Sequence, residues 1–189
     1  MALSRFFAAI ATCALLAGTP GLADEIQDID RQYREGDLSA ALDRADRFLV
    51  QNPQDAQARF LKGLILADQG KTRDAIAVFS GLTEDYPELP EPYNNLAVLY
   101  ASQGQYEAAK NALDMATRAH PGYATAHENL GDIHAKMAAI AYDKAQALDS
   151  KNTMAKAKLT LIRNMLGEPP DKPATAKPLP DPVLPAPAR

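Results

Sequence analysis

Residues 90–123, PEPYNNLAVLYASQGQYEAAKNALDMATRAHPGY, contain the pattern that decides the fold. Apolar residues recur three and four positions apart in both halves, which indicates two amphipathic helices. Pro90 opens the first half, Gly104 separates the halves and Pro121 follows the second. Because proline suits a first helical turn and glycine suits a helix C-terminus, this stretch predicts an antiparallel helical hairpin.

The landmarks of this hairpin recur with one period along the chain. They lie 34 residues apart as Pro53, Pro87 and Pro121, as Gly36, Gly70 and Gly104, and as Ala41, Ala75 and Ala109. A fixed period of this size is typical of stacked copies of one small helical unit, each of which needs its neighbours to bury its apolar face. The expected fold class is therefore all-α, a solenoid of helical hairpins.

One set of large and small residues in the 90–123 unit resembles the tetratricopeptide repeat: Tyr93, Leu96, Ala97, Tyr100, Gly104, Tyr106, Ala109, Leu113, Ala116 and Pro121. The unit at 56–89 resembles it too, although Arg59 and Lys62 stand where large apolar residues are usual. The unit at 24–55 is degenerate, with Asp28 and Gln32 at expected core places, as suits an end unit facing water. The resemblance implies a right-handed solenoid of about three to four repeats plus a C-terminal capping helix.

The fourth unit, residues 124–152, departs from the pattern because the turn between its two helices is missing. Met137 runs straight into Ala138 with neither Gly nor Pro between the two halves. One apolar stripe continues across the junction from Leu130 to Leu148. We expect one unbroken helix over about Thr125–Leu148, and the alternative is a tight kink near Met137.

A last helix, residues 153–167, is expected to cap the array. Asn152 or Thr153 can accept hydrogen bonds from the first free amides of this helix. Its apolar residues are Ala157, Leu161, Ile162 and Met165, and we expect Leu161 to be buried against the irregular fourth unit.

The two ends of the chain lie outside the repeats. Residues 1–23 combine an early Arg5, a short apolar run and small residues up to Ala23, which is typical of a cleaved secretory signal peptide. A retained membrane anchor is disfavoured because the apolar run is shorter than the ~20 residues of a spanning helix. Lipidation is disfavoured because Thr12 precedes Cys13. Residues 168–189 contain eight prolines and are expected to form a disordered tail, a docking peptide or a spacer.

Composition excludes several classes of function. The net charge is −4 and no block of Lys or Arg exists, so we expect neither nucleic-acid binding nor a polybasic membrane patch. Cys13 falls within the signal, which leaves no thiol for disulfides, catalysis or metal binding. No catalytic or cofactor motif is present, and no enzyme activity, cofactor or metal is expected. His127 and His134 are seven residues apart, ~10.5 Å along a straight helix, too far for one zinc ion.

The resemblance also implies a peptide-binding groove lined by the first helix of each unit. The candidate lining residues are Phe60, Leu64, Asn94, Asn95, Val98, Glu128, Asn129 and Asp132, with Asp68, Glu91, Ser102, Thr125 and Lys136 beside them. Asn95 and Asn129 lie one period apart, and an Asn amide can pair with a peptide backbone whatever its side chains. The lining is acidic, so a neutral or basic segment should be preferred.

These features predict a periplasmic scaffold or adaptor of the bacterial cell envelope that binds a protein or peptide partner. The mature chain is expected to lack a membrane span. The alternative is a structural module that forms homo-oligomers through its apolar end helices. The sequence does not name the partner.

Overall fold

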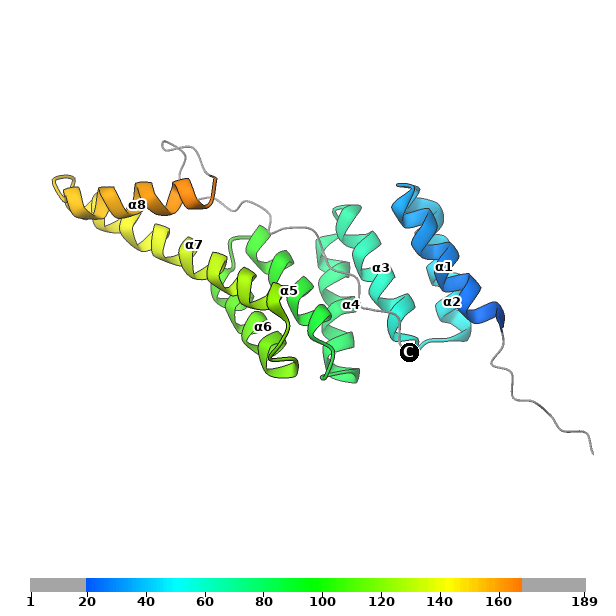
Figure 1. The fold of residues 1–189 in the computed structure, drawn as a ribbon. Coiled ribbons are helices and arrows are strands. Elements are labelled where there is room, and N and C mark those ends of the chain that lie inside the picture. The colour runs from blue at the N-terminus through cyan, green and yellow to red at the C-terminus, as the bar shows by residue number, and fades with distance from the viewer. Residues whose placement is uncertain (1–19, 168–189) are drawn as a thin grey trace, which may run out of the picture.

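The computed structural model describes residues 20–167, and side chains from residue 24 onward. Eight helices occupy this range: α1 (Pro20–Arg34), α2 (Leu38–Gln51), α3 (Ala56–Asp68), α4 (Thr72–Asp85), α5 (Pro90–Ser102), α6 (Tyr106–Ala119), α7 (Ala124–Leu148) and α8 (Thr153–Met165) (Figure 1). The predicted signal peptide lies outside the described residues except for its last four, with which α1 begins. The proline-rich tail, residues 168–189, lies outside them entirely.

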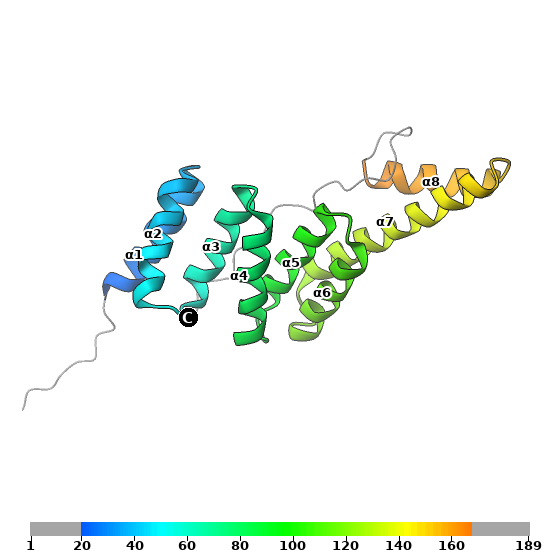
Figure 2. The ribbon, with the colours of Figure 1, turned by 180° about the vertical axis from the view of Figure 1, so that it is seen from behind.

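Successive hairpins stack side by side to form a two-layered array. In Figure 1 the first helices α3, α5 and α7 lie in front of the second helices, and the view from behind brings α4 and α6 forward (Figure 2). Each helix contacts the next along the chain, and α1 also contacts α3, as α5 contacts α7. This is an all-α solenoid of the kind that the 34-residue period predicts.

The repeated glycines make the same turn in three hairpins. Gly36, Gly70 and Gly104 have φ of 84°, 72° and 74°, a left-handed conformation that side chains with a Cβ rarely adopt. The amide three residues beyond each helix then donates to a carbonyl of the last helical turn, as from Gln105 N to Tyr100 O at 2.9 Å. These are C-terminal caps, and they reverse the chain within three residues.

The hydrophobic core lies within the hairpins and continues from each hairpin to the next. One cluster joins α1, α2 and α3, and a second joins α3 through α7. Helix α3 contributes to both, because Ala58, Leu61 and Ile65 lie in the first cluster whereas Phe60 and Leu64 lie in the second. A helix that is buried on two faces depends on both of its neighbours for stability.

Gly63 allows the two helices of the second unit to approach closely. A Cβ placed there would lie 2.7 Å from two ring atoms of Phe79 on α4. The Phe79 side chain is 1% exposed, and its ring meets that of Phe60 edge to face, with centroids 5.4 Å apart. The ring therefore has no free space into which it can move.

We expect Gly63→Ala to lower the free energy of unfolding by about 1–3 kcal/mol, because the added methyl overpacks this contact. Gly131 on α7 is a matched control, since a Cβ there meets nothing within 4 Å. Gly131→Ala should stabilise the protein by up to ~1 kcal/mol, because alanine favours helix. Urea denaturation of both variants would measure the change in the free energy of unfolding. Equal destabilisation of the two would contradict the packing argument.

Helix α7 spans 25 residues without a break, from Ala124 to Leu148. The fourth unit therefore has a single long helix in place of a hairpin, and α8 folds back along its C-terminal half (Figure 1). Asn152 caps α8, since its side chain accepts from the amide of Ala155 at 2.9 Å. Within residues 20–167, no helix is both long and apolar enough to cross a bilayer.

The buried face of α8 differs from the expectation at Leu161. Leu161 is 69% exposed and Met165 is 66% exposed, so the prediction that Leu161 is buried was wrong. The residues that pack on α7 are Ala155 and Leu159, at 5% and 3% exposure. Helix α8 has more apolar residues than one face can bury, and tertiary contacts select the face that includes Leu159.

Leu159→Ala should lower the free energy of unfolding by about 2–4 kcal/mol, because it leaves a cavity between α7 and α8. Leu161→Ala should change it by less than about 0.5 kcal/mol, because that side chain is already in water. Chemical denaturation of the two single variants makes this comparison directly. A larger loss from Leu161→Ala would mean that α8 docks through the other face.

Candidate functional site

The candidate peptide-binding surface is the side of the array formed by the first helices, α1, α3, α5 and α7, which we call the inner surface. The structure places the candidate residues on three of these helices. Glu128 is exposed and Val98 and Asp132 are half-buried, as is Glu91, whereas Asp68 and Ser102 are exposed nearer the ends of their helices. Side chains from three successive units therefore lie on one surface of the molecule.

Phe60 and Leu64 lie deeper than a lining role would suggest. Their side chains are 2% and 1% exposed and belong to the core cluster that joins α3 to α4 and α5. Their ability to contact a ligand stays a prediction. What they do in the structure is hold α3 against its neighbours.

The three candidate asparagines differ in their contacts. Asn129 Nδ2 on α7 donates to Asn94 Oδ1 on α5 at 2.7 Å, and both side chains are 1% exposed. Asn95 Nδ2 instead donates to the carbonyl of Glu91 in its own helix at 2.8 Å. The residues one period apart, Asn95 and Asn129, are therefore not equivalent in their contacts.

Two acceptor atoms at this surface bind no hydrogen among the described residues. They are Asn129 Oδ1 and Glu91 Oε2, both inaccessible to solvent. Buried acceptors usually have a donor, and each unmet one is costly. Because both atoms are buried, a partner's N–H would reach them only after the side chains that cover them have moved.

Tyr123, at the N-terminus of α7, has a perturbed ionisation. Burial, followed by the nearby Glu91 carboxylate, raises the pKa of its phenol to about 12 from an ordinary value of 10.0. Both causes act in the same sense, because each disfavours the negatively charged phenolate. The phenol therefore stays protonated and able to donate through the physiological range.

This shift predicts an alkaline loss of stability. The folded state retains the Tyr123 proton more tightly than the unfolded state, so its contribution is complete below pH 10 and is lost as the pH rises towards about 12. Tyr123→Phe keeps the ring and removes the ionisation. Urea titrations across this pH range should show a shallower decline for the variant, and parallel curves would exclude the effect.

The charged groups of the inner surface are mainly acidic. The acidic residues are Glu91, Glu128 and Asp132, and the basic one is Lys136, which is only 6% exposed. Asp68 accepts from the Tyr33 hydroxyl at 2.8 Å, a contact that joins α1 to α3. This balance of charge favours a neutral or basic ligand.

The histidines have no arrangement that suits a metal. His127 Nε2 lies 3.0 Å from the carbonyl oxygen of Pro121 and, as an N–H donor, ties α7 to the preceding turn. Within the described part of the chain, no three His, Cys, Asp or Glu side chains gather closely enough to hold an ion.

The two basic departures from the repeat pattern have a structural explanation that the sequence did not supply. Arg59 Nη1 pairs with Asp85 at 2.6 Å and Lys62 Nζ with Asp46 at 2.6 Å. Both basic residues line an open depression of about 340 Å³ between α2, α3 and α4. Each ion pair joins α3 to a second helix, so the two charges replace apolar contacts at the edge of the array.

Comparison with known families agrees with this geometry. The tetratricopeptide repeat family matches residues 29–90 and, in a second match, residues 66–130. These matches together cover more than half of the 189 residues, and the chain belongs to the tetratricopeptide repeat (TPR) family. No curated protein matches the chain.

Several solved structures share the fold. The MamA protein superposes with a TM-score of 0.56 at 21% identity, over 77% of this chain and 82% of that one. The Yersinia enterocolitica type III secretion chaperone SycD, solved with a peptide of the translocator YopD, gives 0.57 at 16% identity, over 60% and 92%. YrrB, described as a TPR protein with an unusual peptide-binding site, gives 0.53 at 26% identity, over 57% and 55%. The chain spans 23% of one longer protein that it also matches.

Proposed function

We propose that this protein is a non-enzymatic scaffold or adaptor of the bacterial cell envelope that binds an extended or helical segment of a partner protein on its inner surface. The family and the fold support the coarser statement, a protein-interaction module. The fold neighbours include a chaperone solved with a peptide and a protein described by its peptide-binding site. The secretory pattern at the N-terminus supports a periplasmic location.

The observation that carries the proposal is the asparagine pair between α5 and α7. The bond between Asn94 and Asn129 fixes two neighbouring first helices, and Asn129 Oδ1 remains unmet. Glu91 Oε2 is also unmet, so two acceptors without a donor lie buried where two units meet. A peptide N–H or a basic side chain would satisfy them once the side chains that cover them move aside.

Site-directed photocrosslinking would test this assignment. A photoreactive phenylalanine analogue replaces Glu128, which is exposed on α7, in a chain expressed with its signal in the cell envelope. We expect partner crosslinks from this position because it lies on the inner surface. The matched control is the same analogue at Asn111, which is exposed on the second helix α6.

The outcomes separate the two surfaces. Crosslinks from position 128 that are absent from position 111 would support the inner surface, and mass spectrometry of the adduct would identify the partner. Crosslinks from position 111 alone would place the partner on the opposite face. An adduct with a nucleic acid or lipid instead of protein would exclude the proposed class.

A further inference from the structure

Among the described residues, none covers an apolar surface at the C-terminal end of the array. Met154, Leu161 and Met165 on α8 are 66%, 69% and 66% exposed. They lie at positions i, i+7 and i+11, so they form one line, about 16 Å long, along the surface of the helix. We call these three residues the end stripe. None of the described helices packs on it.

A solenoid normally avoids such a surface at its ends. Each unit buries a face against the next, so terminal units need a polar outer face to remain soluble. The N-terminal end follows this rule, since Arg44 on α2 bonds Glu25 at 2.8 Å and 3.0 Å and also bonds Asp28. Within residues 24–55, Val50 is the one large apolar residue that is exposed, whereas α8 has three such residues.

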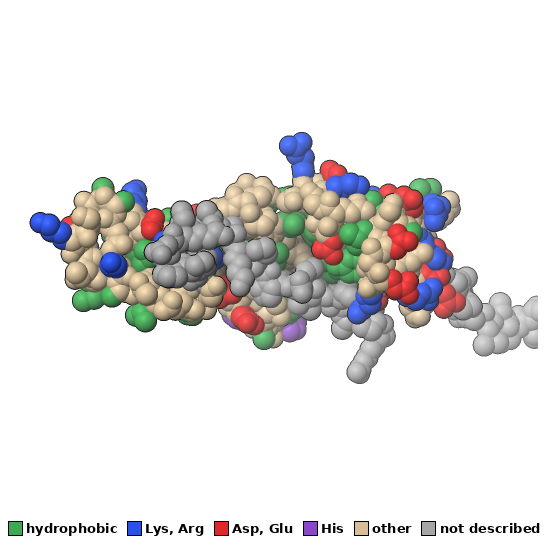
Figure 3. All heavy atoms as spheres, turned by 90° about the horizontal axis from the view of Figure 1, so that it is seen from above, with side chains coloured by type: hydrophobic (Ala, Val, Ile, Leu, Met, Phe, Trp, Pro, Cys, Tyr) green, Lys and Arg blue, Asp and Glu red, His purple; other side chains and the backbone are tan. Residues whose placement is uncertain are grey.

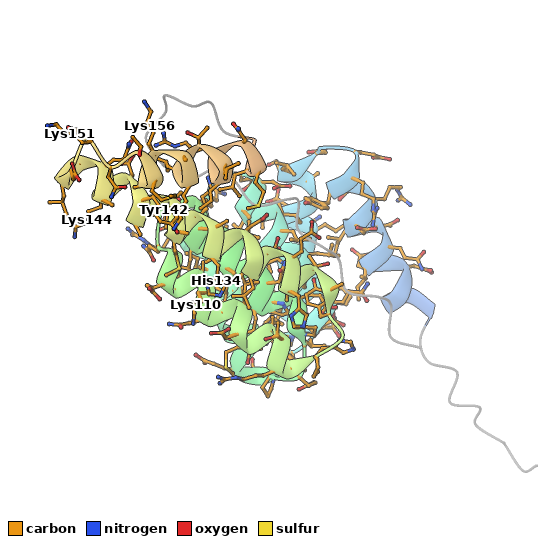
Figure 4. All side chains as sticks on the ribbon, turned by 60° about the vertical axis from the view of Figure 1, so that its left-hand side comes forward. Lys110, His134, Tyr142, Lys144, Lys151 and Lys156 are labelled. Carbon is orange, nitrogen blue, oxygen red and sulfur yellow. The ribbon has the colours of Figure 1, made fainter. Side chains whose placement is uncertain are left out.

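The surroundings of the end stripe are basic. Residues 138–167 contain Lys144, Lys151, Lys156, Lys158 and Arg163 against Asp143 and Asp149, a net charge of +3 in a chain of net −4. Helix α8 itself has three basic residues and no acidic one. Lys158 lies beside the stripe with its Nζ 5.3 Å from the centre of the Tyr142 ring. Figure 4 shows Lys144, Lys151 and Lys156 pointing outward around the tip of the hairpin, and Figure 3 shows blue and green side chains at this end.

We propose that the end stripe binds an acidic amphipathic helix of a partner protein, which continues the solenoid where the next unit would lie. The spacing supports a helical occupant, because an apolar line of this register is what one helix presents to another. The basic side chains around the end stripe support an acidic occupant. This surface is separate from the inner surface, so the proposal does not depend on the function proposed above.

Other occupants fit the charges less well. A second α8 would bring three more basic residues against these, and like charges repel. The acidic N-terminal unit of a second copy shows no matching apolar face from residue 24 onward, since the exposed residues of α1 in that range are polar. The chain's own residues 168–189 have three acidic and three basic side chains and so offer no net negative charge. Binding to a lipid surface would not require the apolar residues to lie on one line of the helix.

Methyl NMR of the full chain gives a direct test. The methyls of Met154 and Met165 report on the end stripe, and that of Met115, 41% exposed on α6, is the internal control. The probe is a synthetic helical peptide of about 15 residues with leucines along one face and glutamates beside them. A second peptide has lysine in place of every glutamate.

We expect the acidic peptide to shift Met154 and Met165 but not Met115, and to bind about tenfold or more tightly than its basic counterpart. Leu161→Ser should weaken this binding about tenfold, whereas Val50→Ser, at an equally exposed apolar residue of α2, should not. Lys158→Glu should weaken it similarly, with Lys71→Glu as the control of equal charge change. Circular dichroism melting would show that each variant remains folded.

Three results would overturn the proposal. One is equal affinity for the two peptides, or no shift of the Met154 and Met165 methyls. Another is a shift of these methyls with vesicles of about one-third phosphatidylglycerol but not with the peptide, which would indicate a lipid surface. The third is concentration-dependent broadening of the same methyls without peptide, together with dimers in sedimentation, which would indicate a second copy.

Discussion

Burial of each first helix on two faces is the constraint on which the rest of the structure depends. In helix α3, Leu61 and Ile65 belong to the cluster shared with the preceding hairpin, whereas Phe60 and Leu64 belong to the cluster shared with α4 and the following hairpins. Neither cluster is complete without a neighbour, so the stability of the array is a sum of contacts between adjacent units. A surface lined by evenly spaced helices follows from this arrangement, and it is the surface on which we propose that a partner binds.

Close approach between helices is the second consequence of that constraint. Gly63 leaves space for the Phe79 ring, and Ala97 in α5 is wholly buried at the position one period later. Where neighbouring first helices approach, polar side chains are buried as well. Asn129 donates to Asn94, but Asn129 Oδ1 accepts no hydrogen bond among the described residues. The inner surface therefore combines a packed scaffold with acceptors that are buried without a donor.

The last helix, α8, is buried on one face only by the described residues. Helix α7 continues straight where the family has a turn, so α8 covers only the C-terminal half of α7 and turns Leu159 inward. An unclosed solenoid end with a basic surround is an unusual feature for a soluble array. The two surfaces of the protein thus differ in chemistry, one acidic and set between units, the other apolar and basic and set at the end.

The sequence by itself determined the helical class, the 34-residue repeat and the positions of the turns, because glycine and proline act through local backbone geometry that needs no partner. The tertiary structure alone decided which side chains meet. The period equates Asn95 with Asn129, yet Asn94 makes the contact, since adjacent helical residues point about 100° apart and the offset between packed helices selects one of them. Leu161 and Leu159 are alike in sequence, and the crossing of α8 over α7 places one in the core and the other in water.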